Sequence, residues 1–258
     1  MARRATAIKG ITASAEGAVL ILDAGSSLSG QYVSRMAQGE NMVEAMNAMG
    51  YDAMGIGYND TTIGLDALQT REKQADFAMV SGNLVAAETQ ELYFDPYVII
   101  ERDGIKFGIL GLSDTSATSQ GAGFIDKATV LDATETARKY VAELEPQVDA
   151  IIVLSLLGQD ADEQLAADVP GINVIVGGTS GELMQEPTRV GNTLIVQQGY
   201  NGEWMGVLQA TFDAEGVPSN YTESLITLGP DYADDPEMAK LVEKWSLLYP
   251  TPTPTPAE

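Results

Sequence analysis

The chain has 258 residues, and its 14 Lys and Arg against 37 Asp and Glu give a formal net charge of −23. A charge this negative repels phosphate backbones and anionic lipids, so nucleic-acid partners and membrane-surface binding are disfavoured. The sequence contains no Cys and no His, which excludes disulfides, thiolate nucleophiles, Ser-His-Asp triads and metals held by thiolates or imidazoles.

The first half of the chain alternates helical and extended patterns. Apolar residues at helical spacing predict helices over residues 2–16, 39–49 and 64–75. Continuous apolar runs predict buried parallel strands at 18–22, 51–56 and 77–80. The pair Asp103-Gly104 separates two β-rich runs, which is typical of a two-residue hairpin.

In the second half, the alternation continues before it gives way to strands alone. We expect a helix over 126–145, a strand over 150–154, a helix over 160–168 and a strand over 174–178. Four strands without helices follow, over 188–190, 193–198, 203–213 and 221–228. Asp235 as cap and Pro236 in the first turn begin a last helix that ends near Leu248. This order indicates an α/β fold with two sheets covered by helices.

The C-terminal segment differs in composition from the rest. Residues 249–258 alternate Pro and Thr, which favours extended polyproline II geometry. We therefore expect one domain over 1–248 and an extended tail over 249–258. No apolar run is long enough to span a membrane, and no signal peptide is present in this chain. The tail is a possible assembly segment, through Tyr249, Pro250, Pro252, Pro254 and Pro256.

Ligands of open α/β sheets bind beyond the carboxyl ends of the strands, which directs attention to four loops. These loops begin at Gly25, Gly57, Ser155 and Gly178. With their flanks and the strands between them, these loops include the stretches Leu22-Asp23-Ala24-Gly25, Tyr51-Asp52-Ala53-Met54, Gly64-Leu65-Asp66, Val80-Ser81, Gly108-Ile109-Leu110-Gly111-Leu112, Ile152-Val153-Leu154-Ser155, Val174-Ile175-Val176-Gly177-Gly178 and Gly199-Tyr200-Asn201-Gly202. In this order, from residue 2 to about 248, the sequence resembles the N-terminal domain of the bacterial 5′-nucleotidase group of calcineurin-like metallophosphoesterases.

The resemblance implies a four-layer α/β/β/α sandwich of two mixed sheets flanked by helices, without the family's first strand. It also implies a degenerate site, because residues of another type stand where the family has its metal ligands. Asp60 keeps a carboxylate, but one carboxylate does not hold two metal ions. We therefore expect no metal, no cofactor and no catalytic residue. The former site positions are Ser26, Tyr58, Asn59, Asp60, Leu156, Thr179 and Gly181.

Other polar groups have simpler interpretations. The spacing of Asp160, Asp162 and Glu163 suits Ca²⁺ only in part, and carboxylates at a helix N-terminus explain it better. The loop that begins at Gly178 lacks the Lys of a phosphate loop and is interpreted as an ordinary turn. Nucleophilic catalysis by Ser26 would need a lysine as base in the cleft.

Three functions fit an intact fold with an altered site. The first is a catalytically inactive structural protein, outside the cell or at its surface, which assembles with itself into a filament, tube or surface layer. Strand addition at the unfilled sheet position is a way for a partner to join it. The alternative is a non-catalytic binding protein that uses the cleft. A second alternative is a residual hydrolase with chemistry unlike that of the family.

Overall fold

The computed structural model describes most of the chain. Of the positions discussed above, Tyr200, Pro254 and Pro256 lie outside the described residues. The described residues are 1–119, 124, 126–179, 181, 183–199, 201–213 and 216–252.

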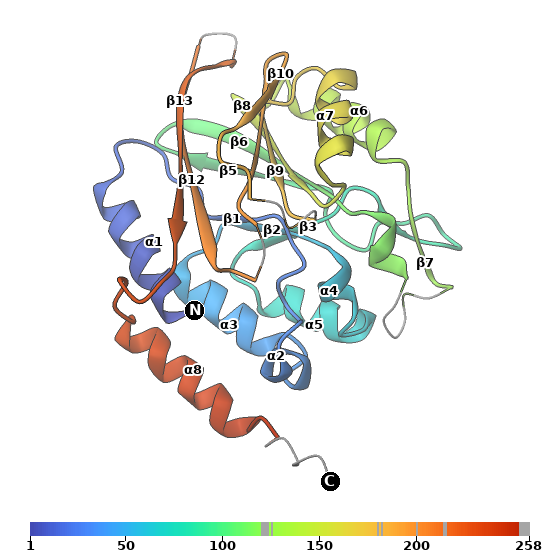
Figure 1. The fold of residues 1–258 in the computed structure, drawn as a ribbon. Helices are drawn as coiled ribbons and strands as arrows, with labels where there is room; N and C mark the ends of the chain where they lie inside the picture. Colours follow the sequence, from blue (N-terminus) through green and yellow to red (C-terminus); the bar gives the residue numbers. More distant parts are fainter. Residues whose placement is uncertain are drawn as a thin grey trace.

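A six-stranded sheet, in the order β10-β11-β9-β8-β6-β5, forms the larger of two central layers (Figure 1). Its inner strands are parallel and its two edge strands are antiparallel to their neighbours. The hairpin between β5 and β6 turns at Asp103 and Gly104, both with positive φ, as the sequence predicts. The strands are β5 (Tyr97–Arg102), β6 (Ile105–Leu112), β8 (Ala150–Ser155), β9 (Val174–Gly177), β10 (Thr188–Val190) and β11 (Thr193–Gln197).

A smaller parallel sheet, in the order β1-β2-β3, packs against the larger one. It consists of β1 (Leu22–Asp23), β2 (Ala53–Gly55) and β3 (Ala78–Val80). Apolar side chains of both sheets share one buried cluster, which includes Ala53 and Val80 of the smaller sheet and Ile109 and Ile152 of the larger sheet. The strands are buried on both sides, which explains why their sequences are apolar without alternation.

Helices cover the outer face of each sheet (Figure 1). On the smaller sheet, α3 (Glu40–Met49) and α5 (Leu65–Gln74) bury Met46 and Leu68 in one cluster. On the larger sheet, α6 (Ala133–Leu144) and α7 (Gln159–Asp168) bury Tyr140, Leu144 and Leu165 in another. The four-layer α/β/β/α arrangement that the resemblance implies is therefore confirmed.

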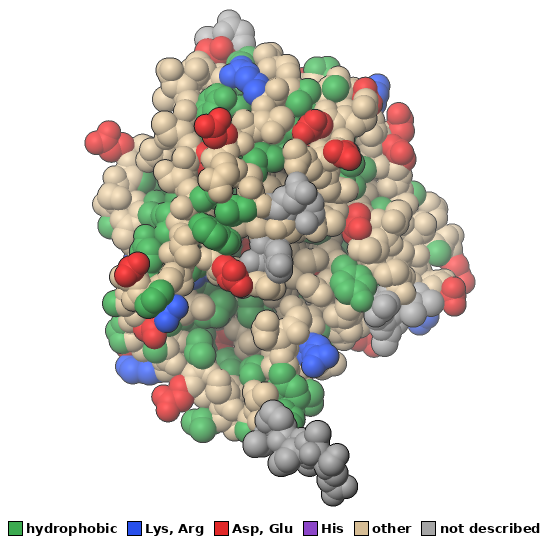
Figure 2. All heavy atoms as spheres, viewed as in Figure 1, with side chains coloured by type: hydrophobic (Ala, Val, Ile, Leu, Met, Phe, Trp, Pro, Cys, Tyr) green, Lys and Arg blue, Asp and Glu red, His purple; other side chains and the backbone are tan. Residues whose placement is uncertain are grey.

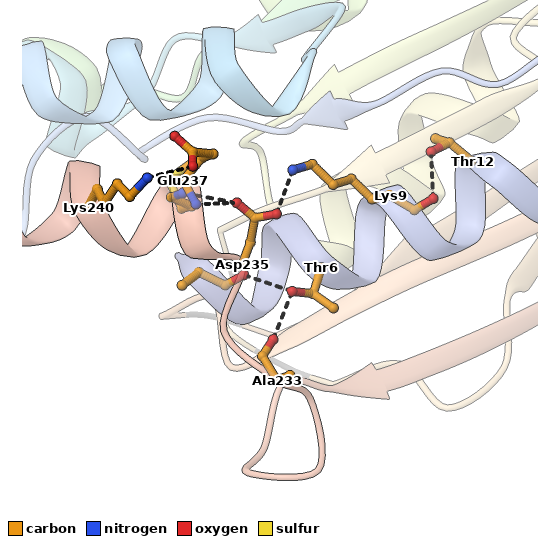
Figure 3. Close-up of polar contacts among 9 residues, drawn as sticks. Thr6, Lys9, Thr12, Ala233, Asp235, Glu237 and Lys240 are labelled. Carbon is orange, nitrogen blue, oxygen red and sulfur yellow. Dashed lines mark hydrogen bonds and ion pairs between the residues drawn. The ribbon is translucent and has the colours of Figure 1, made fainter.

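The first and last helices pack together on one side of the molecule. Met238 of α8 (Pro236–Leu248) lies in a buried cluster with Ala5 and Ile8 of α1 (Ala2–Ser14). The Asp235 carboxylate accepts the backbone N–H of Glu237 and Met238, as expected for a cap, and Lys9 Nζ lies 2.5 Å from it (Figure 3). This cap and ion pair fix the position of α8 against α1.

Several elements differ from the sequence prediction. The helix expected over 126–145 begins later than predicted. The Asp132 side chain accepts the N–H of Glu135 as the cap of α6, which starts at Ala133. Residues before it form β7 (Ala128–Val130), which pairs with an unpredicted β4 (Leu84–Ala86). Of the strand expected over 18–22, only Leu22 belongs to β1, which extends one residue further to Asp23. The other unpredicted elements are α2 (Tyr32–Met36), α4 (Tyr58–Thr61) and the 3₁₀ helix η1 (Thr115–Thr118).

The last two strands form a separate ribbon, β12 (Trp204–Phe212) with β13 (Pro218–Thr227). They pair as an antiparallel hairpin, which agrees with the predicted run of strands without helices. Acidic side chains are spread over the face of the molecule in Figure 2. Within the described part of the chain, no helix combines the length and the apolar character needed to cross a membrane.

Candidate functional site

The loops after β1, β2, β8 and β9 meet at one edge of the sandwich, because parallel strands end on the same side. A cavity of about 2620 Å³ opens there and continues along β1. Five of the seven predicted site positions line it: Ser26, Tyr58, Asn59, Thr179 and Gly181.

Asp60 lies beneath this surface and joins two of the loops. Its side chain is fully buried. One carboxylate oxygen accepts the backbone N–H of Ser26 at 2.7 Å and of Gly57 at 2.9 Å, and the other accepts the N–H of Leu28 at 2.8 Å. Burial raises the pKa of Asp60 to about 7, against the opposing effect of these bonds. With both oxygens occupied by backbone donors, Asp60 positions the loops.

Ser26 and Asn59 are the polar groups that these loops present to the cavity. The Asn59 amide Nδ2 donates to the Ser26 carbonyl at 3.2 Å, and the Asn59 N–H lies 3.4 Å from Ser26 Oγ. Ser26 has a φ of +61°, which a serine adopts only where its surroundings fix it. Gly57 is needed beside it, since a Cβ there would lie 2.4 Å from Ser26 Oγ. The two loops therefore touch and hold each other.

Leu156 fills the point where the loops converge. Its side chain is 1% exposed. A Cβ built at Gly25 or Gly57 would lie 2.9 or 2.6 Å from Leu156 Cδ1, so this leucine packs against the backbone of both loops. The Thr179 hydroxyl donates to the Leu156 carbonyl. The centre of the site is thus occupied by the apolar side chain of Leu156, and polar groups surround it.

Two carboxylates near the site have roles that the sequence analysis did not assign. Asp114 follows β6, lines the same cavity and accepts the Ser116 hydroxyl at 2.8 Å. Its neighbour η1 packs against α4, which carries Tyr58 and Asn59. The rule that directed attention to the ends of the other parallel strands applies equally to β6, and would have found Asp114.

The second carboxylate is Asp162, which lies in the first turn of α7, as expected, and is only 1% exposed. The Ser155 hydroxyl donates to its Oδ1, while Oδ2 is buried with no hydrogen-bond partner among the described residues. Burial raises the pKa of Asp162 to about 7, and the bond from Ser155 opposes this. Asp162 of α7 therefore contacts the last residue of β8. Its position in the helix does not by itself predict that contact.

The donors at this edge do not fit a pair of metal ions. Hard or borderline divalent ions need several carboxylate, imidazole or thiolate ligands at one point. No group of three or more such side chains that could hold a metal occurs within the described ranges. Asp60 is saturated by backbone N–H groups, and Leu156 occupies the centre.

Comparison with known proteins gives consistent relatives, although no protein-family model matches. The chain is 30% identical over 270 residues to the trifunctional nucleotide phosphoesterase protein YfkN of Bacillus subtilis, covering 89% of this chain and 18% of that protein. It is 30% identical over 200 residues to a 5′-nucleotidase of Vibrio vulnificus, covering 70% of this chain and 36% of the relative. A solved 5′-nucleotidase precursor from Thermus thermophilus matches with a TM-score of 0.88 and 30% identity, over 96% of this chain and 52% of that one.

The chain is a homologue of the N-terminal domain of 5′-nucleotidases and calcineurin-like phosphoesterases. The family resemblance that the loop sequences carry is therefore confirmed. This 5′-nucleotidase homologue spans less than two thirds of the length of these relatives. Similarity over part of their length does not by itself assign the activity, substrates or partners of these longer proteins to this chain.

The prediction of a catalytically inactive, filament-forming structural protein is wrong by this comparison. Inactivity was inferred from the altered site positions, and self-assembly from the unfilled sheet position and the tail. The similarity to a nucleotide phosphoesterase extends over 89% of the chain in the Bacillus relative. Those relatives indicate a hydrolase, and none of them indicates a structural filament. The loss of ligand type at the individual site positions stays a prediction from the sequence.

Proposed function

We propose that this domain hydrolyses phosphate esters of nucleotides. The observation that carries the proposal is its 30% identity over most of its length to proteins named as nucleotide phosphoesterase and 5′-nucleotidase. The cavity at the carboxyl ends of the parallel strands supports it, because ligands of such sheets bind there. The second alternative left open by the sequence, a hydrolase with its own chemistry, is the one that this proposal develops.

The residues around the cavity suit the parts of a nucleotide. The Ser26 hydroxyl and the second N–H of the Asn59 amide are neutral donors that can hydrogen-bond phosphate oxygens. The Tyr58 ring offers an aromatic surface to a base. Asp114 supplies a carboxylate that can take a proton from the attacking water and return it to the nucleoside oxygen as the P–O ester bond breaks. No step in this proposal uses a metal ion, since the donor set does not fit one.

The same relatives and the net charge support the predicted location and the predicted partners. One relative is a snake venom 5′-nucleotidase of Gloydius brevicauda, 29% identical over 96% of this chain. A venom protein is secreted, and this supports a location outside the cell or at its surface. The net charge of −23 supports the absence of nucleic-acid partners. Self-association, and the division into a domain over 1–248 and a tail over 249–258, stay predictions from the sequence.

The test is release of inorganic phosphate from adenosine 5′-monophosphate by the purified chain. We expect turnover by the natural sequence and a loss of about 100-fold or more in Asp114→Asn, which removes the proton acceptor. The matched control is Glu88→Gln, the same carboxylate-to-amide change at an exposed turn residue. Its rate should equal that of the natural chain.

Two results would overturn parts of the proposal. No phosphate release by the natural chain, despite binding of the nucleotide, would contradict hydrolysis. Equal rates in Asp114→Asn and Glu88→Gln would be consistent with hydrolysis but would show that Asp114 is not the proton acceptor. Circular dichroism of each variant shows that a lost rate is not lost folding.

A further inference from the structure

A buried hydrogen-bond network lies at the seam between the two sheets. Ser81 follows β3 of the smaller sheet, and Ser113 follows β6 of the larger sheet. The two strands approach so closely that a Cβ at Gly111 of β6 would overlap the Val80 carbonyl oxygen. The side chains of Ser81, Asn83 and Ser113 are all fully buried here. Burial of a polar group is costly unless the group is hydrogen-bonded, so the partners of these three side chains define the network.

Asn83 fixes the backbone of Ser113 on both sides. Its Oδ1 accepts the Ser113 N–H at 2.8 Å, and its Nδ2 donates to the Ser113 carbonyl at 2.8 Å. The same Nδ2 donates to the Leu131 carbonyl at 3.3 Å, which uses the remaining proton of the amide. Both peptide planes that flank Ser113 are therefore held. One of them joins Ser113 to Asp114, the proposed proton acceptor, so Asn83 determines where the chain places Asp114.

The Ser113 hydroxyl joins this part of the network to the end of β2. It donates to the Ile56 carbonyl at 2.6 Å, and the Ser81 hydroxyl lies 2.8 Å from it. Because Ser113 has only one hydroxyl proton, Ser81 is the donor in the second bond. The Ile56 carbonyl belongs to the peptide whose N–H comes from Gly57, and that N–H donates to Asp60. The hydrogen bonds therefore continue from the end of β6 into the loops after β2 and β1.

We propose that Asn83 is a positioning residue for nucleotide hydrolysis, because it holds Asp114 at a fixed place relative to the loops that bind the phosphate. This inference rests on the proposed function, in which Asp114 takes a proton from the attacking water. Asn83 is fully buried and does not line the cavity, so it acts through Asp114 and touches no substrate. A displacement of about 1 Å at a reacting group can lower a rate about 100-fold, and the two bonds to Ser113 prevent such a displacement.

The test is a double-mutant cycle on phosphate release from adenosine 5′-monophosphate by the full chain. Asn83→Ala should lower kcat about tenfold or more and change KM less than about twofold, since the groups that bind the phosphate stay in place. In the Asp114→Asn background the same substitution should cause no further loss, because Asn83 acts through Asp114. Ser113→Ala removes a single hydroxyl and should follow the same pattern. It replaces Asn83→Ala in the cycle if that variant does not fold.

Asn173→Ala is the matched control, at the opposite end of the larger sheet. Asn173 precedes β9, its Oδ1 accepts the Ile151 N–H at 2.6 Å, and its Nδ2 donates to the Gly216 carbonyl. Its loss should also lower stability, but kcat should stay within about twofold of the natural rate. Hydrogen–deuterium exchange gives a readout that needs no activity. Residues 113–116 should exchange about tenfold faster in Asn83→Ala and at the natural rate in Asn173→Ala.

The outcomes separate this inference from the proposed function. Phosphate release by the natural chain, with equal losses from Asn83→Ala in the natural and the Asp114→Asn backgrounds, would overturn the positioning role and leave hydrolysis standing. Unchanged exchange of residues 113–116 in Asn83→Ala, or an equal loss of kcat in Asn173→Ala, would do the same. Absence of phosphate release by the natural chain would overturn the proposed function and the positioning role together.

Discussion

The carboxylate of Asp60, which follows β2, accepts the backbone N–H of Ser26, which follows β1, at 2.7 Å. The same carboxylate accepts two more backbone N–H groups, from Leu28 and Gly57. One buried side chain therefore determines the relative position of two loops at the candidate site. Its chemistry is best tested through folding and through pH.

Asp60→Asn should destabilise the protein. The amide replaces one accepting oxygen with a donor, so at least one buried N–H loses its partner, at a cost of about 2–4 kcal/mol in the free energy of unfolding. Urea unfolding measures it. Asp66→Asn, at an exposed position in the first turn of α5, is the matched control and should change stability far less. Equal effects of the two substitutions would contradict the role assigned to Asp60.

Stability should fall as pH rises from about 4 to about 7. Burial raises the pKa of Asp60 and of Asp162 to about 7, above the value of about 3.9 in the unfolded chain. The folded state then binds more protons than the unfolded state in this window, so its advantage is fully present below the unfolded pKa and is lost as pH passes the folded pKa. Asp162→Asn should flatten the decline, measured by urea unfolding at several pH values. A natural chain equally stable across the window would contradict the raised pKa values.

Leu156→Ala should leave a cavity where the four loops meet. Removal of a buried leucine side chain costs about 2–5 kcal/mol, depending on how far the surroundings collapse. Leu247 is 74% exposed at the end of α8, and Leu247→Ala should cost less than about 0.5 kcal/mol. Thermal and urea unfolding of the pair decide this. A small effect at Leu156 would mean that the loops are not packed around it.

Asp235→Ala should loosen α8 from α1. The change removes both the cap of α8 and the ion pair with Lys9. Lys9→Ala removes only the ion pair and should have the smaller effect, because half-exposed ion pairs contribute little. Hydrogen exchange of residues 236–248 is the measurement. Loss of protection equal in the two variants would assign the attachment to the ion pair alone.

Nucleotide hydrolysis by this chain should survive a chelator. The described residues offer no cluster of ligands for a metal, so phosphate release should be the same with and without EDTA. Abolition by EDTA and recovery with a divalent ion would contradict this interpretation of the donor set. It would also show that ligands come from residues or segments outside those described.

The sequence predicts those parts of the fold that local chemistry decides. Asp103-Gly104 requires two residues at positive φ, and Asp235-Pro236 begins a helix, so both are found as predicted. The short pairing of β4 with β7 was missed, because three-residue strands depend on a distant partner more than on their own pattern.

The site was predictable in position but only partly in chemistry. The ends of parallel strands located Ser26, Tyr58 and Thr179 on one cavity. The burial of Asp162 depends on how α7 packs against the sheet. The sequence pattern predicts only that Asp162 lies at the start of a helix. Likewise, the cavity is lined by residues of β1 and β12, two strands about 180 residues apart in the sequence.

The central claim is hydrolysis of a nucleotide phosphate ester, and the most direct measurement is a time course of phosphate release from adenosine 5′-monophosphate by the purified natural chain. The proposal predicts that phosphate accumulates to many molecules per protein chain, with Asp114→Asn slower by about 100-fold or more. Phosphate that never exceeds the uncatalysed background, while the nucleotide binds, would contradict it.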